Sequence, residues 1–252
     1  MDLIFHTLPN GIRLVHYPTA SEVAHCGVII NAGSRDELAD EHGMAHFIEH
    51  MLFKGTAKRK SFHILSRLED VGGELNAYTT KEETAIHASF LKEHYPRAVE
   101  LIADLLFGST FNPAEIAKEK EVVIEEINSY LDNPAEYIFD EYEELIFPDQ
   151  PIGRSILGHP DTVKAITREK IGSFIARNYS TSQMVFCSVG ALNSRQIISL
   201  FEKNFSKITS RTCPPRVRGE YRYTPVKRER KMDTFQNHCI IGNIAYDLRD
   251  RH

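Results

Sequence analysis

Residues 43–53 read GMAHFIEHMLF, an apolar run that carries three polar side chains, His46, Glu49 and His50. In a helix these positions are i, i+3 and i+4, so all three side chains project from one face. The other positions are almost all apolar, which indicates a helix that is buried on its remaining sides. Because burying imidazoles and a carboxylate without partners costs free energy, the pattern favours a ligand site.

Two imidazoles one helical turn apart can bind one zinc ion through neutral nitrogens, and the intervening Glu49 can take a proton from a metal-bound water. The order His-x-x-Glu-His is the inverted form of the zincin motif. The alternative is a helix whose histidines are only exposed or hydrogen-bonded, and the apolar residues around His46 and His50 argue against it. The segment therefore predicts a metal centre.

A catalytic zinc site usually has three protein ligands and one open position. A helix predicted over residues 112–131 offers candidates, since it begins with Asn112-Pro113 and carries five glutamates: Glu115, Glu119, Glu121, Glu125 and Glu126. Glu119 and Glu126 are seven positions apart and so lie on nearly the same face. Spacing alone does not choose among the five, and for any single Glu a solvated surface position is the default.

The remaining pattern indicates short strands and amphipathic helices. Strands are predicted at 3–8, 12–17, 23–32, 75–80, 84–91 and 184–189. Helices are predicted at 43–53, 61–71, 95–107, 112–131, 134–147, 167–179 and 193–205. This order is not a steady alternation of strand and helix. It predicts an α+β fold, a mostly antiparallel β-sheet covered by helices.

The chain of 252 residues has 42% hydrophobic and 26% charged residues and a net charge of -5. A negative charge argues against nucleic acid as a partner. No apolar run approaches the ~18–20 residues that span a bilayer, so no membrane partner is expected. Residues 1–9 lack the pattern of a signal peptide, and the four cysteines form no CxxC pair. We therefore expect a cytoplasmic protein with reduced cysteines.

The composition changes near residue 210. Residues 211–231 hold eight Lys or Arg residues and three prolines, which we interpret as a solvated linker with one charged strand. A basic patch for nucleic acid is the alternative, and it predicts salt-sensitive binding. Residues 235–246 then read as a further strand. The expected domains are 1–210 and 211–252, the second containing the basic linker and the start of an incomplete unit.

Three segments together resemble the pitrilysin and mitochondrial processing peptidase family, zinc metallopeptidases with the inverted motif. They are residues 43–56, GMAHFIEHMLFKGT; residues 72–79, GGELNAYT; and residues 119–127, EKEVVIEEI. The resemblance runs over residues 3–205. In that family the third zinc ligand is the glutamate seven residues after the first acid of the last segment, which implies Glu126 here. Glu119 matches the family's supporting glutamate near the metal.

The resemblance implies a zinc-dependent endopeptidase with one zinc ion per chain on His46, His50 and Glu126. Glu49 would move the proton of the attacking water and Glu119 would support the site. We expect the strand that holds Asn76 and Ala77 to pair with an extended peptide, which suits unfolded peptides and short polypeptides.

Members of the family carry two homologous halves. The partners implied are therefore a peptide substrate and a second homologous half, in this polypeptide or as a homo- or heterodimer partner. Residues 235–246 resemble the start of that second half. A non-catalytic structural or substrate-binding subunit of a processing-peptidase-like complex is the alternative function. Such a subunit has no need for the complete set of metal ligands and Glu49, so the complete set favours the enzyme.

Overall fold

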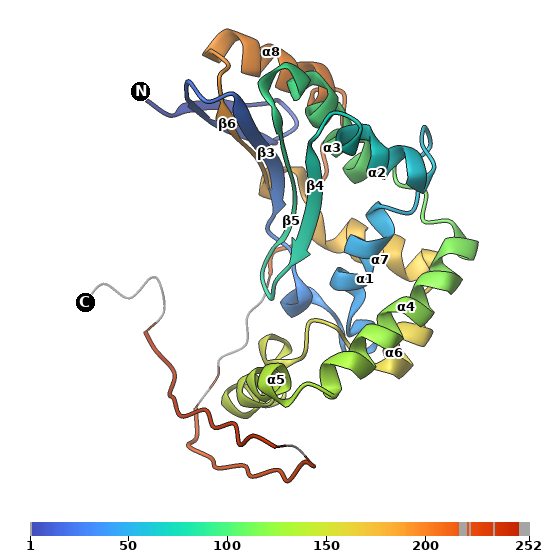
Figure 1. Cartoon of the computed structure of the whole chain (residues 1–252), viewed down its shortest axis with the longest axis vertical. Coiled ribbons are helices and arrows are strands. Elements are labelled where there is room, and N and C mark those ends of the chain that lie inside the picture. Colours follow the sequence, from blue (N-terminus) through green and yellow to red (C-terminus); the bar gives the residue numbers. More distant parts are fainter. Residues whose placement is uncertain (1, 217–220, 222, 234, 247–252) are drawn as a thin grey trace.

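The computed structural model describes residues 2–216, 221, 223–233 and 235–246, and the predicted α+β fold is confirmed (Figure 1). A single six-stranded sheet has the strand order β1-β2-β6-β3-β5-β4. The strands are β1 (Ile4–Thr7), β2 (Arg13–Pro18), β3 (Val23–Ile30), β4 (Glu74–Thr79), β5 (Thr84–Leu91) and β6 (Met184–Gly190). Only β2 and β6 pair in parallel; the other neighbours are antiparallel.

Most of the helices lie to the right of this sheet in Figure 1, with α2 and α3 beside its upper part, α8 above it and α5 below it. The helices are α1 (Met44–Leu52), α2 (Ser61–Glu69), α3 (Tyr95–Gly108), α4 (Pro113–Leu131), α5 (Pro134–Ile146), α6 (Pro160–Lys164), α7 (Arg168–Asn178) and α8 (Ser194–Phe205). Short 3-10 turns are η1 (Ser34–Asp36), η2 (Ala39–Glu41), η3 (Lys92–His94), η4 (Pro151–Gly153) and η5 (Thr181–Gln183). No helix among the described residues is long and apolar enough to span a membrane.

Helix α1 runs through the core, as its sequence predicts. Phe47, Ile48, Met51 and Leu52 are at most 1% exposed. Burial of each such side chain contributes about 1.5–3 kcal/mol to stability, so the apolar residues alone are enough to hold α1 in place. The polar face of α1 is thereby fixed in orientation and points toward α4 and β4, the elements that α1 also contacts.

The segment after residue 210 differs from the prediction. Residues 235–246 form no strand, and Phe235 and Ile241 are fully or almost fully exposed. A strand needs a neighbouring strand to pair with, and the described part of the chain offers none there. The rest of the expected second unit includes residues 217–220 and 247–252, which lie outside the described residues.

Two basic residues of the segment after residue 210, Arg228 and Arg230, contact α5. Arg228 lies 3.0 Å from Glu144, and Arg230 lies 2.9 Å from Glu141 with its guanidinium 5.0 Å from the ring centre of Tyr137. The prediction of a charged strand within residues 211–231 is also wrong, because the residues described there form no strand. Exposed ion pairs contribute about 0–1 kcal/mol each, so these contacts position the segment only weakly.

Candidate metal centre

The start of α1 is held by close backbone contact and by a buried carboxylate. Gly43 has φ 92°, and a Cβ atom there would lie 2.8 Å from the carbonyl oxygen of Leu157, so only glycine fits. Glu37 accepts hydrogen bonds from the backbone N–H groups of Gly43, at 3.0 Å, and Ala45, at 2.9 Å. Burial raises the pKa of Glu37 to about 8, although these two hydrogen bonds act against the rise. This end of α1 is therefore fixed against the 155–158 loop.

His46 and His50 direct their Nε2 atoms at each other from successive turns of α1, 3.2 Å apart. Glu126 of α4 faces both: its Oε1 lies 3.7 Å from His46 Nε2 and its Oε2 lies 3.5 Å from His50 Nε2. The three residues offer ligand atoms within 4.8 Å of one another. The structure thus brings together the three residues predicted as metal ligands.

The separations fit a zinc ion. Zinc bonds of about 2.0–2.2 Å at tetrahedral angles place ligand atoms roughly 3.3–3.6 Å apart. The two imidazole nitrogens are 3.2 Å apart, and they lie 3.7 and 3.5 Å from Oε1 and Oε2 of Glu126, respectively, all close to that range. Two imidazole nitrogens and one carboxylate oxygen also match the donor set of catalytic zinc sites, which leave one position open. The residues present therefore fit the metal that the sequence predicts.

The two histidines differ in electrostatic environment. Burial, together with the nearby His50, lowers the pKa of His46 to about 4, so this imidazole is neutral at pH 7. Burial also acts to lower the pKa of His50, but its hydrogen bond to Glu119 and the charge of Glu126 outweigh burial and raise it. Since a metal ligand must be unprotonated, His46 is ready to bind and His50 must release a proton at mildly acidic pH.

Glu119 lies behind His50 rather than beside the ligand atoms. Its Oε1 is 2.8 Å from His50 Nδ1 and its Oε2 is 2.6 Å from Lys54 Nζ. Burial acts to raise the pKa of Glu119, yet these two hydrogen bonds outweigh it and the pKa is lowered. An ionised Glu119 favours a proton on Nδ1, which leaves Nε2 of His50 free for a metal. Nδ1 of His46 is buried without a comparable partner among the described residues.

Glu49 shares the face of α1 that carries the two histidines. The hydroxyl of Thr79, at the end of β4, donates to Glu49 Oε2 at 2.6 Å. Burial raises the pKa of Glu49, and the Thr79 hydrogen bond partly offsets the rise. A carboxylate with a raised pKa beside a metal site is suited to accept and return a proton.

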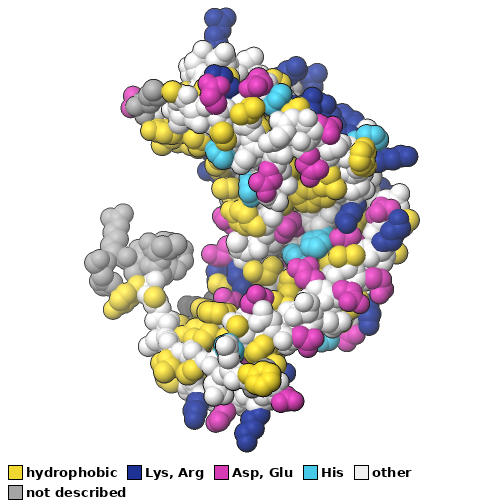
Figure 2. Space-filling model, viewed as in Figure 1, with side chains coloured by type: hydrophobic (Ala, Val, Ile, Leu, Met, Phe, Trp, Pro, Cys, Tyr) yellow, Lys and Arg dark blue, Asp and Glu magenta, His cyan; other side chains and the backbone are white. Residues whose placement is uncertain are grey.

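A cavity of about 690 Å³ opens next to these residues, and Figure 2 shows histidines and acidic side chains in the hollow. His46, Glu49 and Glu126 line one wall. The others that line it are Ala77, Tyr78, Thr79, Ser129, Tyr130, Asn133, Glu136, Asp140, Ser155, Ile156 and Leu157. With four carboxylates and no Lys or Arg in its lining, the cavity presents a negative potential.

The two residues predicted to bind substrate differ in position. Ala77 lines the cavity, whereas the exposed side chain of Asn76 lies on the other face of β4 and donates to Glu74 at 2.6 Å. Side chains alternate along a strand, so the Asn76 side chain projects from the face of β4 opposite to that of Ala77. Because β4 is an edge strand, its backbone is nevertheless free to pair with a peptide, and that role stays a prediction.

Sequence reasoning missed the acidic wall opposite α1. Glu136 and Asp140 are one turn apart on α5, a helix whose start at Asn133-Pro134 is predicted from the sequence. Their i, i+4 spacing was a signal for a shared face, but nothing in the sequence places that face against α1. The hydrogen bond from Thr79 to Glu49 had no sequence signal either.

Comparison with known proteins shows the family to which the chain belongs. Residues 14–160, more than half of the chain, match the family model Insulinase (Peptidase family M16), and residues 165–252 match Peptidase M16 inactive domain. The chain is 38% identical over 204 residues to mitochondrial-processing peptidase subunit beta of Dictyostelium discoideum, covering 80% of this chain and 43% of the relative. It is 36% identical over 242 residues to an uncharacterized zinc protease of Mycobacterium leprae, covering 94% and 54%.

Solved structures show the same fold. The periplasmic protease PqqL from Escherichia coli superposes with a TM-score of 0.79 at 27% identity, over 85% of this chain and 25% of that one. A protease from Helicobacter pylori has a TM-score of 0.81 at 24% identity, over 85% and 53%. The chain spans about half the length of the curated relatives that it matches. It belongs to the insulinase family of peptidases, family M16.

Proposed function

We propose that this chain bears the zinc site of a metalloendopeptidase that hydrolyses unfolded peptides or short polypeptides. The observation that carries the proposal is the cluster of His46, His50 and Glu126 with Glu49 opening onto the same cavity. The names of relatives as zinc proteases and processing peptidases support the same activity for this chain.

When bound on His46, His50 and Glu126, zinc supplies a Lewis acid and a water of lowered pKa. Glu49 accepts the proton of the attacking water on its carboxylate and later delivers it to the leaving amine. The Thr79 hydroxyl holds that carboxylate in place. Glu119 positions the His50 ring through Nδ1 and has no contact with the reacting atoms.

Substrate recognition follows from the shape and charge of the cavity. The edge strand β4 offers backbone groups to an extended peptide at Ala77. Glu136 and Asp140 line the cavity without a Lys or Arg partner among the described residues, so a basic side chain of the substrate would be favoured there. Peptides with Arg or Glu near the cleaved bond test this preference. We expect the Arg peptide to be cleaved faster than the Glu peptide. This difference in rate should shrink in the double variant that combines Glu136→Gln and Asp140→Asn.

A second homologous half, or a partner chain, would complete the enzyme. The chain spans about half of its relatives, and its residues 165–252 match the inactive-domain model. Because some relatives are named as subunits, a non-catalytic partner role is the second candidate. Our assignment of residues 1–210 to the zinc-bearing unit and of 211–252 to the beginning of the next stays part of this proposal.

The first experiment measures zinc by elemental analysis and cleavage of a quenched fluorescent peptide. Wild type should hold about one zinc per chain, and Glu126→Gln should lose it. Glu125→Gln is the matched control, because Glu125 is the exposed neighbour of Glu126 on α4. Glu49→Gln should keep zinc and lose turnover by at least about a hundredfold.

Each outcome has a defined meaning. Chelator-sensitive cleavage that Glu49→Gln abolishes supports the enzyme and its base. Zinc without cleavage in wild type, even after addition of a homologous second half, supports the partner role. Wild type that takes up no zinc under metal-replete conditions would overturn the metal centre itself.

A further inference from the structure

A second cavity, of about 440 Å³, lies where α2, α3 and α8 meet, and none of its lining residues lines the metal-centre cavity. We call it the α2–α3–α8 cavity. It is lined by Arg59, Arg67, Glu93, His94, Pro96, Arg97, Glu100, Leu200, Lys203 and Asn204. Its volume falls in the range of about 300–1,000 Å³ that is usual for small-molecule sites.

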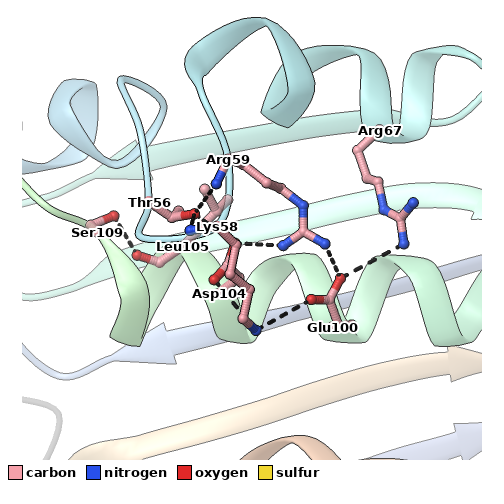
Figure 3. Close-up of polar contacts among 8 residues, drawn as sticks. All are labelled: Thr56, Lys58, Arg59, Arg67, Glu100, Asp104, Leu105 and Ser109. Atoms are coloured by element: carbon pink, nitrogen blue, oxygen red, sulfur yellow. Dashed lines mark hydrogen bonds and ion pairs between the residues drawn. The ribbon is translucent and has the colours of Figure 1, made fainter.

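Four cationic side chains line this cavity against two carboxylates, and one cation is fully engaged. Arg59 donates through Nη1 to Asp104 at 2.5 Å and through Nη2 to Glu100 at 2.7 Å (Figure 3). Lys58 lies 3.6 Å from Glu100 as well. Arg59 and Lys58 together balance the charges of Glu100 and Asp104, so the lining keeps three further cations against the single carboxylate of Glu93.

Arg67 reaches toward the same carboxylate from α2 but does not bond to it closely (Figure 3). Its Nη2 is 3.8 Å from Glu100, too long for a hydrogen bond. Its Nε is buried and has no hydrogen-bond partner within the part of the chain described. The Nε atom itself is closed off from the cavity, but the Arg67 side chain is 37% exposed and lines it, so an anion there can contact the guanidinium group.

Arg97 and Lys203 complete the set. Arg97 donates through Nη1 to the backbone carbonyl oxygen of Arg67 at 2.9 Å, which ties the Arg97 guanidinium group to the backbone of α2. Within the described part of the chain, neither Arg97 nor Lys203 makes an ion pair with a carboxylate. Figure 2 shows Lys and Arg side chains along the upper right edge of the molecule, where Figure 1 places these helices.

We propose that the α2–α3–α8 cavity binds a small anion that carries a phosphate group. Guanidinium groups match phosphate oxygens in a two-point geometry, and Lys203 adds a point charge. Helix α3, fourteen residues long, begins at this cavity, and no side chain caps its start, so its dipole adds positive potential. Such a ligand would bridge Arg67, Arg97 and Lys203 and so hold α2 against α3 and α8.

The test is titration of the metal-free full chain with pyrophosphate, followed by calorimetry at fixed ionic strength. Removing the metal keeps the probe from binding at the zinc site. Wild type should bind saturably, and Lys203→Gln should bind about tenfold more weakly, the effect of one charge-assisted contact. Lys207→Gln is the control, because Lys207 is exposed four residues later and does not line the cavity. Arg97→Gln should weaken binding at least as much as Lys203→Gln.

Further arms identify the source of the phosphate. Inorganic phosphate, adenosine diphosphate and vesicles with or without phosphatidic acid are compared in the same variants. The probe that binds more weakly to Lys203→Gln, and as tightly as wild type to Lys207→Gln, identifies the source of the phosphate. No saturable binding to wild type, or equal loss in both lysine variants, would overturn the proposal. Zinc content and peptide cleavage, measured on the same samples, report separately on the metal centre.

Discussion

Nδ1 of His50 and Oε1 of Glu119 lie 2.8 Å apart across the interface of α1 and α4. This contact turns a buried carboxylate into a positioning group, because it favours the tautomer in which Nε2 of His50, the nitrogen that faces Glu126, carries no proton. Lys54, on the opposite side of Glu119 at 2.6 Å, keeps that carboxylate charged. The metal centre therefore depends on a residue that offers it no ligand atom.

Replacing Glu119 should weaken metal binding without removing a ligand. In Glu119→Gln the amide cannot hold the His50 Nδ1 proton with a full charge, so we expect zinc affinity to fall about 10- to 100-fold. Competition with a fluorescent chelator measures it. The control is Glu121→Gln, an exposed glutamate on the same helix. An unchanged affinity in Glu119→Gln would mean that the contact with His50 is incidental.

Thr79 should set the acidic limb of the pH–rate profile. Its hydrogen bond lowers the pKa of Glu49 against the larger rise caused by burial. In Thr79→Val that opposition is lost, so the pKa of Glu49 rises further. Since Glu49 acts as a base in its ionised form, the acidic limb of kcat/KM should move to higher pH. Thr79→Ser keeps the hydroxyl and should restore the wild-type limb; a limb that stays in place in Thr79→Val would argue against Glu49 as the base.

Acid should destabilise the metal-free protein through His46. The folded pKa, about 4, lies below the unfolded value of 6.5. The unfolded chain therefore binds the proton first, and stability present above pH 6.5 is lost as the pH falls toward 4. The loss attributable to this group is about 3 kcal/mol at most. Denaturant unfolding of wild type and His46→Gln, both with chelator, gives the two pH slopes.

The slope of the free energy of unfolding against pH should be shallower in His46→Gln over that interval. His63→Gln, which removes an exposed histidine on α2, should leave the wild-type slope unchanged. Equal slopes in wild type and His46→Gln would show that this imidazole is not kept neutral by the fold.

Two glycine substitutions should have opposite signs. Gly43→Ala forces a side chain into φ 92° and against the Leu157 carbonyl, so we expect a loss of at least about 1–3 kcal/mol. Gly172→Ala, inside α7 where a Cβ meets nothing within 4 Å, should instead stabilise by about 0.5–1 kcal/mol. Thermal unfolding of both variants checks the pair. Gly43→Ala with wild-type stability would contradict the close approach to the 155–158 loop.

The sequence by itself determined the local geometry of the metal helix. His46, Glu49 and His50 share a face because helical periodicity leaves them no other arrangement once the flanking positions are apolar. Capping chemistry likewise predicted where α4 begins, and Asn112 does accept from the N–H of Ala114. These features depend on residues within one or two turns, so periodicity and capping are sufficient to predict them.

Only the tertiary structure decided which distant groups meet. Spacing left five glutamates open on α4, and the packing of α4 against α1 brings Glu126 to the imidazoles and Glu119 behind His50. It also inserts β6 between β2 and β3, and turns the Asn76 side chain away from the cavity. Such choices depend on free energies summed over many contacts between segments far apart in the chain, and no local pattern records that sum.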